Sequence, residues 1–155
     1  MTHKGAFHDV VLDPLPGRSG TPRVRGETMV IDKGLGLSEL RDLLAIASQY
    51  IDYVKLAFGT AGLYPPSLLK AKLTLIRSHG VGVYPGGTYL EVAYRQGRAQ
   101  AFMDRARALG FTHIEMRGRY EPNGNNHPVL PAEWKSIGQD YARTTEPGKE
   151  EGLLR

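Results

Sequence analysis

The sequence lacks cysteine, long apolar runs and the apolar core of a signal peptide. Without cysteine among its 155 residues, the chain has no disulfides, thiolate metal sites or cysteine nucleophiles. No apolar run approaches the ~20 residues that span a bilayer, and the first 13 residues do not resemble a secretion signal. We therefore expect a soluble, cytoplasmic protein of one domain, with no membrane partner.

The sequence also lacks the motifs of nucleic-acid-binding proteins. The formal net charge is +4, and residues 1–116 contain 14 Lys and Arg against 10 Asp and Glu, whereas residues 117–155 contain six of each. Arginines gather at 18–25 and at 95–107, but no aromatic interleaving accompanies them. A small anionic substrate or a solvated helix face accounts for this charge, so we expect no nucleic-acid partner.

Four short apolar segments alternate with helical patterns. Strands are predicted over about 28–33, 53–59, 81–84 and 113–116. Their starts recur every 25 to 30 residues, which favours a parallel sheet with right-handed crossovers. Four such βα units would make half of an eight-fold barrel, and we assign residues 28–118 to this partial barrel domain.

Capping signals predict where the intervening helices begin. Ser38 is a plausible N-cap for the first helix, which extends to about Ile51. Pro65 and Pro66 suit the first turn of the second helix, which ends at His79-Gly80. Thr88 and Glu91 form a Thr-x-x-Glu capping box that opens a third helix running to about Gly110, weakened at Gly97.

The two ends of the chain differ from this regular centre. Residues 1–27 are rich in Gly, Pro and Arg and predict an extended arm. After Met116 the βα pattern stops, and only residues 132–142 could support a short helix. We expect residues 119–155 to form an irregular or disordered tail, and we hypothesise an altered or truncated end.

The first predicted strand leads directly into charged residues. Met29-Val30-Ile31 has the continuous apolar character of a strand buried on both faces, and Asp32 and Lys33 follow it. These two side chains cannot be buried there without partners. They mark either the rim of an active site, because βα units place polar chemistry at the carboxyl ends of strands, or a structural ion pair.

Several linked motifs follow one another along residues 10–116. They are Pro14-Leu15-Pro16 with Thr21-Pro22-Arg23, Thr28 to Gly34, Tyr50-Ile51-Asp52, Val54 to Thr60, Leu63-Tyr64-Pro65, Val83 to Thr88, Glu91, Gln96-Gly97, Leu109-Gly110-Phe111 and Ile114-Glu115. In these motifs the chain resembles the phosphosulfolactate synthase family, which also takes in related plant heat-stress proteins.

The resemblance implies a (β/α)8 TIM-barrel fold and a lyase. The implied reaction is the magnesium-dependent addition of sulfite to phosphoenolpyruvate, which gives (2R)-phospho-3-sulfolactate. It is a first step toward coenzyme M in methanogens and toward sulfolactate in some spore-forming bacteria. A complete barrel of this type needs roughly 250 residues, so the present chain would supply about half.

The chain departs from the family after its fourth predicted strand. Family members continue with a small acidic turn, whereas here Met116-Arg117-Gly118-Arg119 follows Glu115. Their fifth strand has a Glu-Val-Gly-Lys-Lys motif whose lysine is a candidate proton donor. Glu146-Pro147-Gly148-Lys149 is a four-residue echo of it, so Lys149 is our candidate for that role.

The implied chemistry suggests roles for the other charged residues. Sulfite attack on C3 of phosphoenolpyruvate builds negative charge on the carboxylate, which Mg2+ would stabilise while an acid protonates C2. Mg2+ prefers hard oxygen ligands, so Asp32 and Glu115 are our metal candidates. The alternative is that each carboxylate forms an ion pair with Lys33 or Lys55.

Cations and helix termini supply the candidate substrate contacts. Lys55 stands in an otherwise apolar strand, so its charge needs a compensating anion. Either a substrate anion or a structural carboxylate would supply it, and we favour the substrate. Lys33 is a second candidate for the same role. Gly86, Gly87 and Thr88 lie at a helix N-terminus suited to phosphate or sulfonate. The last candidates are Arg23 and Arg25, which could close over an anion.

Two functions remain open from the sequence. The first is a phosphosulfolactate synthase-like enzyme built as a half barrel, whose exposed first and fourth strands would promote self-association into a homo-oligomer. The second is a family-like protein without catalysis that acts in binding or in stress. A missing fifth-strand lysine would separate them, because sulfite addition should then be lost even where phosphoenolpyruvate still binds.

Overall fold

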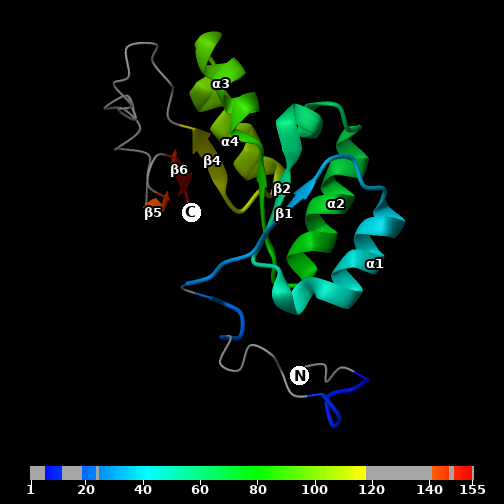
Figure 1. Ribbon diagram of the computed structural model, residues 1–155. Helices are drawn as coiled ribbons and strands as arrows, with labels where there is room; N and C mark the ends of the chain where they lie inside the picture. Colours follow the sequence, from blue (N-terminus) through cyan, green and yellow to red (C-terminus); the bar gives the residue numbers. More distant parts are fainter. Residues whose placement is uncertain (1–5, 12–18, 24, 118–140, 147–148, 155) are drawn as a thin grey trace.

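Two three-stranded sheets form the framework (Figure 1). The computed structural model describes residues 6–11, 19–23, 25–117, 141–146 and 149–154. One sheet is parallel, in the order β1 (Met29–Asp32), β2 (Tyr53–Leu56) and β3 (Gly82–Pro85). The other is antiparallel, in the order β4 (Ile114–Arg117), β6 (Lys149–Leu154) and β5 (Tyr141–Glu146).

Helices connect the parallel strands in the predicted order. They are α1 (Leu37–Ala47) with the 3-10 turn η1 (Ser48–Tyr50), the 3-10 turn η2 (Ala57–Gly62), α2 (Pro66–Ser78), α3 (Gly87–Arg95) and α4 (Ala99–Leu109). The alternation confirms the α/β class with a parallel sheet. Within the described residues there are three parallel strands rather than a closed barrel. No described helix is long and apolar enough to cross a membrane.

Strand alternation divides the parallel sheet into two faces. Val30, Val54 and Val83 share one face, because they are paired in register and every second side chain points the same way. This face packs against α1 and α2, which lie side by side over it (Figure 1), and the core there includes Leu40, Leu44, Leu73 and Ile76. We call the opposite face, which holds Tyr53, Lys55 and Tyr84, the inner face.

The first strand is half exposed, contrary to the expectation that it is buried on both faces. Met29 and Ile31 are each 41% exposed, whereas the neighbouring Val30 is packed against the helical core. The reason is positional. β1 is the edge of the described parallel sheet, and its inner-face side chains have fewer neighbours than those of the central strand β2.

Two capping predictions are each wrong by two residues. The helix α1 has Gly36 rather than Ser38 as its N-cap, and Glu39 instead accepts a hydrogen bond from the Gly36 N–H at 2.9 Å. The helix α3 has Gly86 as its N-cap, so Thr88 lies inside the first turn and makes no capping bond. The proline signal is confirmed, since Pro66 occupies the first position of α2.

The predicted third helix is two helices with a break at Gly97. Its φ of +68° lies in the left-handed region, which a right-handed helix cannot continue through. The Gly97 N–H bonds to the Tyr94 carbonyl at 2.9 Å and so closes α3, and α4 begins two residues later. The two helices pack together through an edge-on contact between Tyr89 and Phe102.

The fourth strand and the tail differ from the prediction. β4 begins beside β3, where the Thr112 N–H bonds to the Val83 carbonyl at 2.9 Å, but its ladder partner is the antiparallel strand β6. Its predicted open edge is therefore paired, and residues 141–146 and 149–154 are strands instead of irregular tail. Most of the predicted helix at 132–142 lies outside the described residues, and its last two residues belong to β5.

Substitution of Gly97 tests the helix break. We expect Gly97→Ala to lower the free energy of unfolding by about 1 kcal/mol, because alanine is strained at a positive φ. Gly97→Asn should lose less, since asparagine tolerates the left-handed region. Urea unfolding of the three chains measures this difference. An alanine variant as stable as the parent would contradict the break.

Candidate functional site

Buried charges identify the candidate site. Among the described residues, the buried charged side chains are Arg23, Asp32, Lys55, Lys72 and Glu115. An unpaired charge in such a position would be strongly destabilising. Each of them belongs to one of three ion pairs, which join Lys72 to Asp32, Lys55 to Glu115 and Arg23 to Asp52.

The first pair joins the end of β1 to the helix α2. Lys72 and Asp32 are both fully buried, and the Lys72 Nζ lies 2.6 Å from the Asp32 Oδ2. The other carboxylate oxygen, Oδ1, accepts the N–H groups of Gly34 and Leu35, each at 2.8 Å. Oδ2 accepts no hydrogen bond of good geometry and depends on the ion pair. Asp32 is thus engaged on both oxygens.

The second pair joins β2 to β4 and to the start of α3. The Lys55 Nζ donates to the Glu115 Oε1, and the other oxygen of Glu115 accepts the N–H of Gly87. Lys55 is 4% exposed and Glu115 is 2% exposed. One carboxylate therefore neutralises a buried ammonium and caps a helix, where the N–H groups and the dipole favour negative charge.

The two pairs lie on opposite faces of the parallel sheet. Lys55 is paired in register with Ile31, whereas Asp32 is paired with Leu56, so Asp32 and Lys55 point to opposite sides. The partner of Asp32 is consistent with this, because Lys72 belongs to α2, which covers the helical face. The sequence correctly predicted Asp32 at the carboxyl end of β1 and Lys55 within the second strand, but it did not show that they point to opposite faces.

The carboxylates do not present a magnesium site. Asp32 and Glu115, the two metal candidates, are each engaged on both oxygens and belong to different faces. The described residues also contain no group of three or more His, Asp or Glu side chains that could hold a metal. Since Mg2+ needs free oxygen ligands, the donor set described here does not fit it.

The structure agrees with the alternative interpretation, in which both carboxylates form ion pairs, but one of the partners was not predicted. Glu115 pairs with Lys55, as that alternative proposed, but Asp32 pairs with Lys72. A signal for Lys72 was present. The apolar stripe of α2 runs through Leu69, Leu73 and Ile76, and Lys72 stands three residues after Leu69 on the same helical face.

The turn at Gly86 and Gly87, predicted to bind an anionic group of the substrate, already binds the carboxylate of Glu115. Gly86 and Gly87 are buried at the N-terminus of α3, and Thr88 is exposed. The Gly87 N–H is bonded to Glu115, and a Cβ at Gly87 would stand 3.3 Å from the side chain of that glutamate. A contact of this length is tight for a Cβ atom, so glycine favours the close approach of the carboxylate to the backbone.

The two arginine candidates lie at the amino end of the strands. Arg23 is buried, with Nη1 3.0 Å from both oxygens of Asp52 and Nη2 2.8 Å from the Gln49 carbonyl. Asp52 also accepts the N–H of Thr28 at 2.7 Å, immediately before β1. Arg23 therefore anchors the arm at the end opposite to Lys55 and Glu115. Arg25 is exposed.

The remaining lysine candidates follow strand ends. Lys33 comes directly after β1 and is exposed. Lys149 begins β6 and is paired with Glu146. Arg117, at the carboxyl end of β4, is opposite Glu151, so the backbone of Lys149 continues two residues beyond that end. Pro147 and Gly148, between the predicted motif's Glu146 and Lys149, lie outside the described residues.

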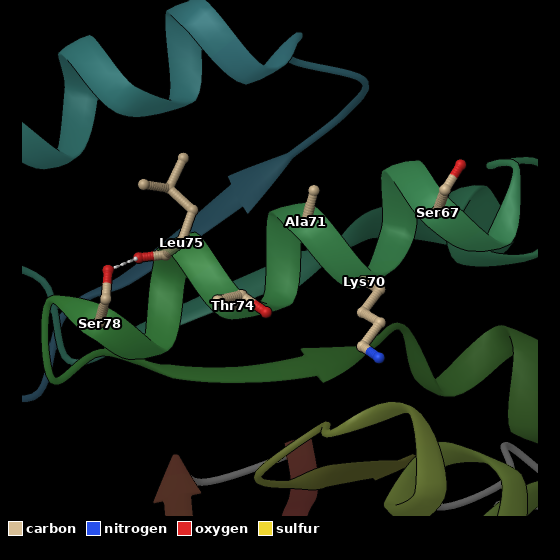
Figure 2. A pocket seen from close by; sticks show the side chains of 6 residues that line it. All are labelled: Ser67, Lys70, Ala71, Thr74, Leu75 and Ser78. Carbon is tan, nitrogen blue, oxygen red and sulfur yellow. Dashed lines mark hydrogen bonds between the residues drawn. The ribbon is translucent and has the colours of Figure 1, made fainter.

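A surface hollow lies on the helix α2, apart from these charges. It is lined by Ser67, Lys70, Ala71, Thr74, Leu75 and Ser78 (Figure 2). All six residues come from one helix, and none is a predicted site residue. The Ser78 hydroxyl donates to the Leu75 carbonyl at 2.7 Å, so it is engaged locally. The hollow does not bring together groups for catalysis.

Comparison with known proteins adds independent information. The family described as (2R)-phospho-3-sulfolactate synthase (ComA) matches residues 16–120. Phosphosulfolactate synthases from Methanothermobacter thermautotrophicus and Methanocaldococcus jannaschii are 43% identical over 101 residues and 38% identical over 92 residues. These alignments cover 65% and 59% of this chain, and 39% and 37% of those proteins.

A bacterial relative gives the same result. The phosphosulfolactate synthase of Bacillus subtilis is 32% identical over 111 residues, which is 72% of this chain and 43% of that protein. The chain therefore spans about two-fifths of the length of these curated relatives. The matched region includes β1 to β4 and the residues of the Lys72–Asp32 and Lys55–Glu115 pairs.

The two arginines form a matched pair for a test of the amino-terminal anchor. We expect Arg23→Ala to lower the free energy of unfolding by about 3 kcal/mol, because Asp52 is left buried without its partner. The exposed Arg25→Ala should change it by less than about 0.5 kcal/mol. Chemical unfolding of both variants measures the difference, and equal losses would contradict the structural role of Arg23.

Proposed function

Because this chain belongs to the (2R)-phospho-3-sulfolactate synthase family, we propose that it binds phosphoenolpyruvate at the carboxyl ends of its strands and adds sulfite to it. The observation that supports this most strongly is the buried Lys55 on the inner face, within the matched region. A buried ammonium beside a helix N-terminus suits a ligand that has both a carboxylate and a phosphate.

In the proposed reaction, a bond forms between the sulfur of sulfite and C3 of phosphoenolpyruvate. The π bond between C2 and C3 breaks and leaves a single bond, its electron pair passes to the carboxylate, and a proton is then delivered to C2. Lys55 would hold the carboxylate, because its ammonium neutralises the charge that develops there. The substrate would compete with Glu115 for this ammonium, since both are anions.

Two further lysines have supporting roles in the proposal. Lys33, exposed after β1, would contact the phosphate or sulfite. Lys149 stays our candidate for the proton donor, because the backbone of β6 runs past the carboxyl end of β4. Gly86, Gly87 and Thr88 would bind an anionic group only where Glu115 has moved from the Gly87 N–H.

Magnesium enters this proposal as a component to be tested. The described carboxylates do not fit it, so no step is assigned to the metal. The self-association expected from an open sheet edge likewise stays a prediction. Its remaining basis is β1, whose inner-face side chains Met29 and Ile31 are partly exposed at the edge of the described parallel sheet.

A second function is binding without catalysis. Two observations favour it. The first is that Asp32, one candidate metal ligand, is engaged by Lys72. The second is that Glu115, the other candidate, is engaged by Lys55. A protein of this kind would retain affinity for phosphoenolpyruvate through Lys55 and would form no product.

An assay of product formation separates the two functions. Purified chain is incubated with phosphoenolpyruvate and sulfite, with and without Mg2+, and phosphosulfolactate is measured by mass spectrometry. We expect product from the parent chain and at least about a hundredfold less from Lys55→Met, because the developing charge loses its partner. Lys70→Met, on the outer side of α2, is the matched control and should retain full activity.

The binding arm of the same experiment uses calorimetric titration with phosphoenolpyruvate. Binding without product in a folded sample would favour the non-catalytic function. A folded sample that shows no binding of phosphoenolpyruvate and forms no product would contradict both functions. Equal activity of the Lys55→Met variant and the parent would contradict the assignment of Lys55.

A further inference from the structure

Lys72 contacts more groups than its ion pair requires. Its ammonium lies 2.6 Å from the Asp32 Oδ2 and donates to the Leu35 carbonyl at 2.6 Å and to the Tyr64 hydroxyl at 3.3 Å. It also stands 4.6 Å from the centre of the Tyr64 ring, a distance suited to a cation–π contact. A fully buried lysine is rare in proteins, and this one makes two hydrogen bonds in addition to its ion pair.

These contacts come from two different loops. Leu35 belongs to the turn between β1 and α1, and Tyr64 belongs to the connection between η2 and α2. Lys72 itself is in the second turn of α2, so its position is fixed by the helix. Through one side chain, the helix therefore holds both of the first two βα connections at the carboxyl end of the sheet.

The first connection is held on both sides. Asp32 accepts the N–H groups of Gly34 and Leu35, while Lys72 binds Asp32 and the Leu35 carbonyl. The exposed Lys33 lies inside this closed arrangement. Its backbone is thereby fixed although its side chain is free to reach solvent.

We propose that Lys72 is a positioning residue, which sets the β1–α1 and β2–α2 connections at the substrate-binding end without contacting the substrate. The part that concerns substrate rests on the proposed function, and the part that concerns the loops does not. Asp32 accordingly acts as the partner that anchors Lys72, and this explains why a partly exposed strand ends in a fully buried carboxylate.

The inference separates stability from substrate affinity. In Lys72→Met the buried Asp32 loses its partner, so the chain should be less stable and the first connection looser. In the double variant Lys72→Met/Asp32→Asn no unpaired charge remains, so stability should return. The Leu35 carbonyl and Tyr64 are still not held, and affinity for phosphoenolpyruvate should stay low.

Amide hydrogen exchange and calorimetric titration test this on the full chain. We expect the Gly34 and Leu35 amides of Lys72→Met to exchange about tenfold faster, because a hydrogen-bonded charge has been removed, while Leu44 in α1 is unchanged. The dissociation constant for phosphoenolpyruvate should rise about tenfold in both Lys72 variants. The exposed Lys70→Met, two residues away, should match the parent in every measurement.

Three results would overturn the inference. One is unchanged exchange at Gly34 and Leu35 in a folded Lys72→Met chain. Another is a double variant that regains parental affinity along with stability, since Lys72 would then be purely structural. The last is loss of affinity in Lys70→Met equal to that in Lys72→Met. If Lys72→Met does not fold, the double variant supplies the affinity result.

A failure of the proposed function would be seen separately. A parent chain that does not bind phosphoenolpyruvate would contradict that function. The exchange rates at Gly34 and Leu35 would still decide whether Lys72 fixes the β1–α1 connection.

Discussion

The structure depends on one constraint: buried charged side chains on neighbouring strands need partners from other elements. Strand alternation sends Asp32 to the helical face and Lys55 to the inner face. Each therefore finds a different partner, Lys72 in α2 or Glu115 in β4. The first pair ties the end of β1 to α2, and the second ties β2 to β4 and to the start of α3.

The Lys55–Glu115 pair has direct consequences for ligand binding. Glu115 supplies negative charge both to a buried ammonium and to the first N–H of α3. A phosphate or carboxylate ligand would find these same two groups attractive, so the chain's own carboxylate is a built-in competitor. The cost of displacing it would lower the affinity for any anion that lacks compensating contacts.

The sequence predicts the order of elements well because each strand and helix has local signals, such as the apolar stripe of α2 and Pro66 at its start. It also places Asp32 at the end of the first strand and Lys55 within the second. Their partners depend on which face of the sheet each side chain points to and on which helix covers that face. A one-residue error in a strand's register reverses the face, so the sequence alone does not identify the partners. The antiparallel pairing of β4 with β6 was missed because residues 141–154 have no strong strand pattern.

The most direct test of the account is a titration of the isotopically labelled chain with phosphoenolpyruvate, followed by amide chemical shifts in NMR spectra. If the ligand competes with Glu115 for Lys55, the Gly87 amide, now bonded to that carboxylate, should shift with saturation. The Thr28 amide, bonded to Asp52 at the opposite end of the sheet, should not move. A saturable shift at Thr28 with none at Gly87 would contradict a binding site at the carboxyl ends of the strands.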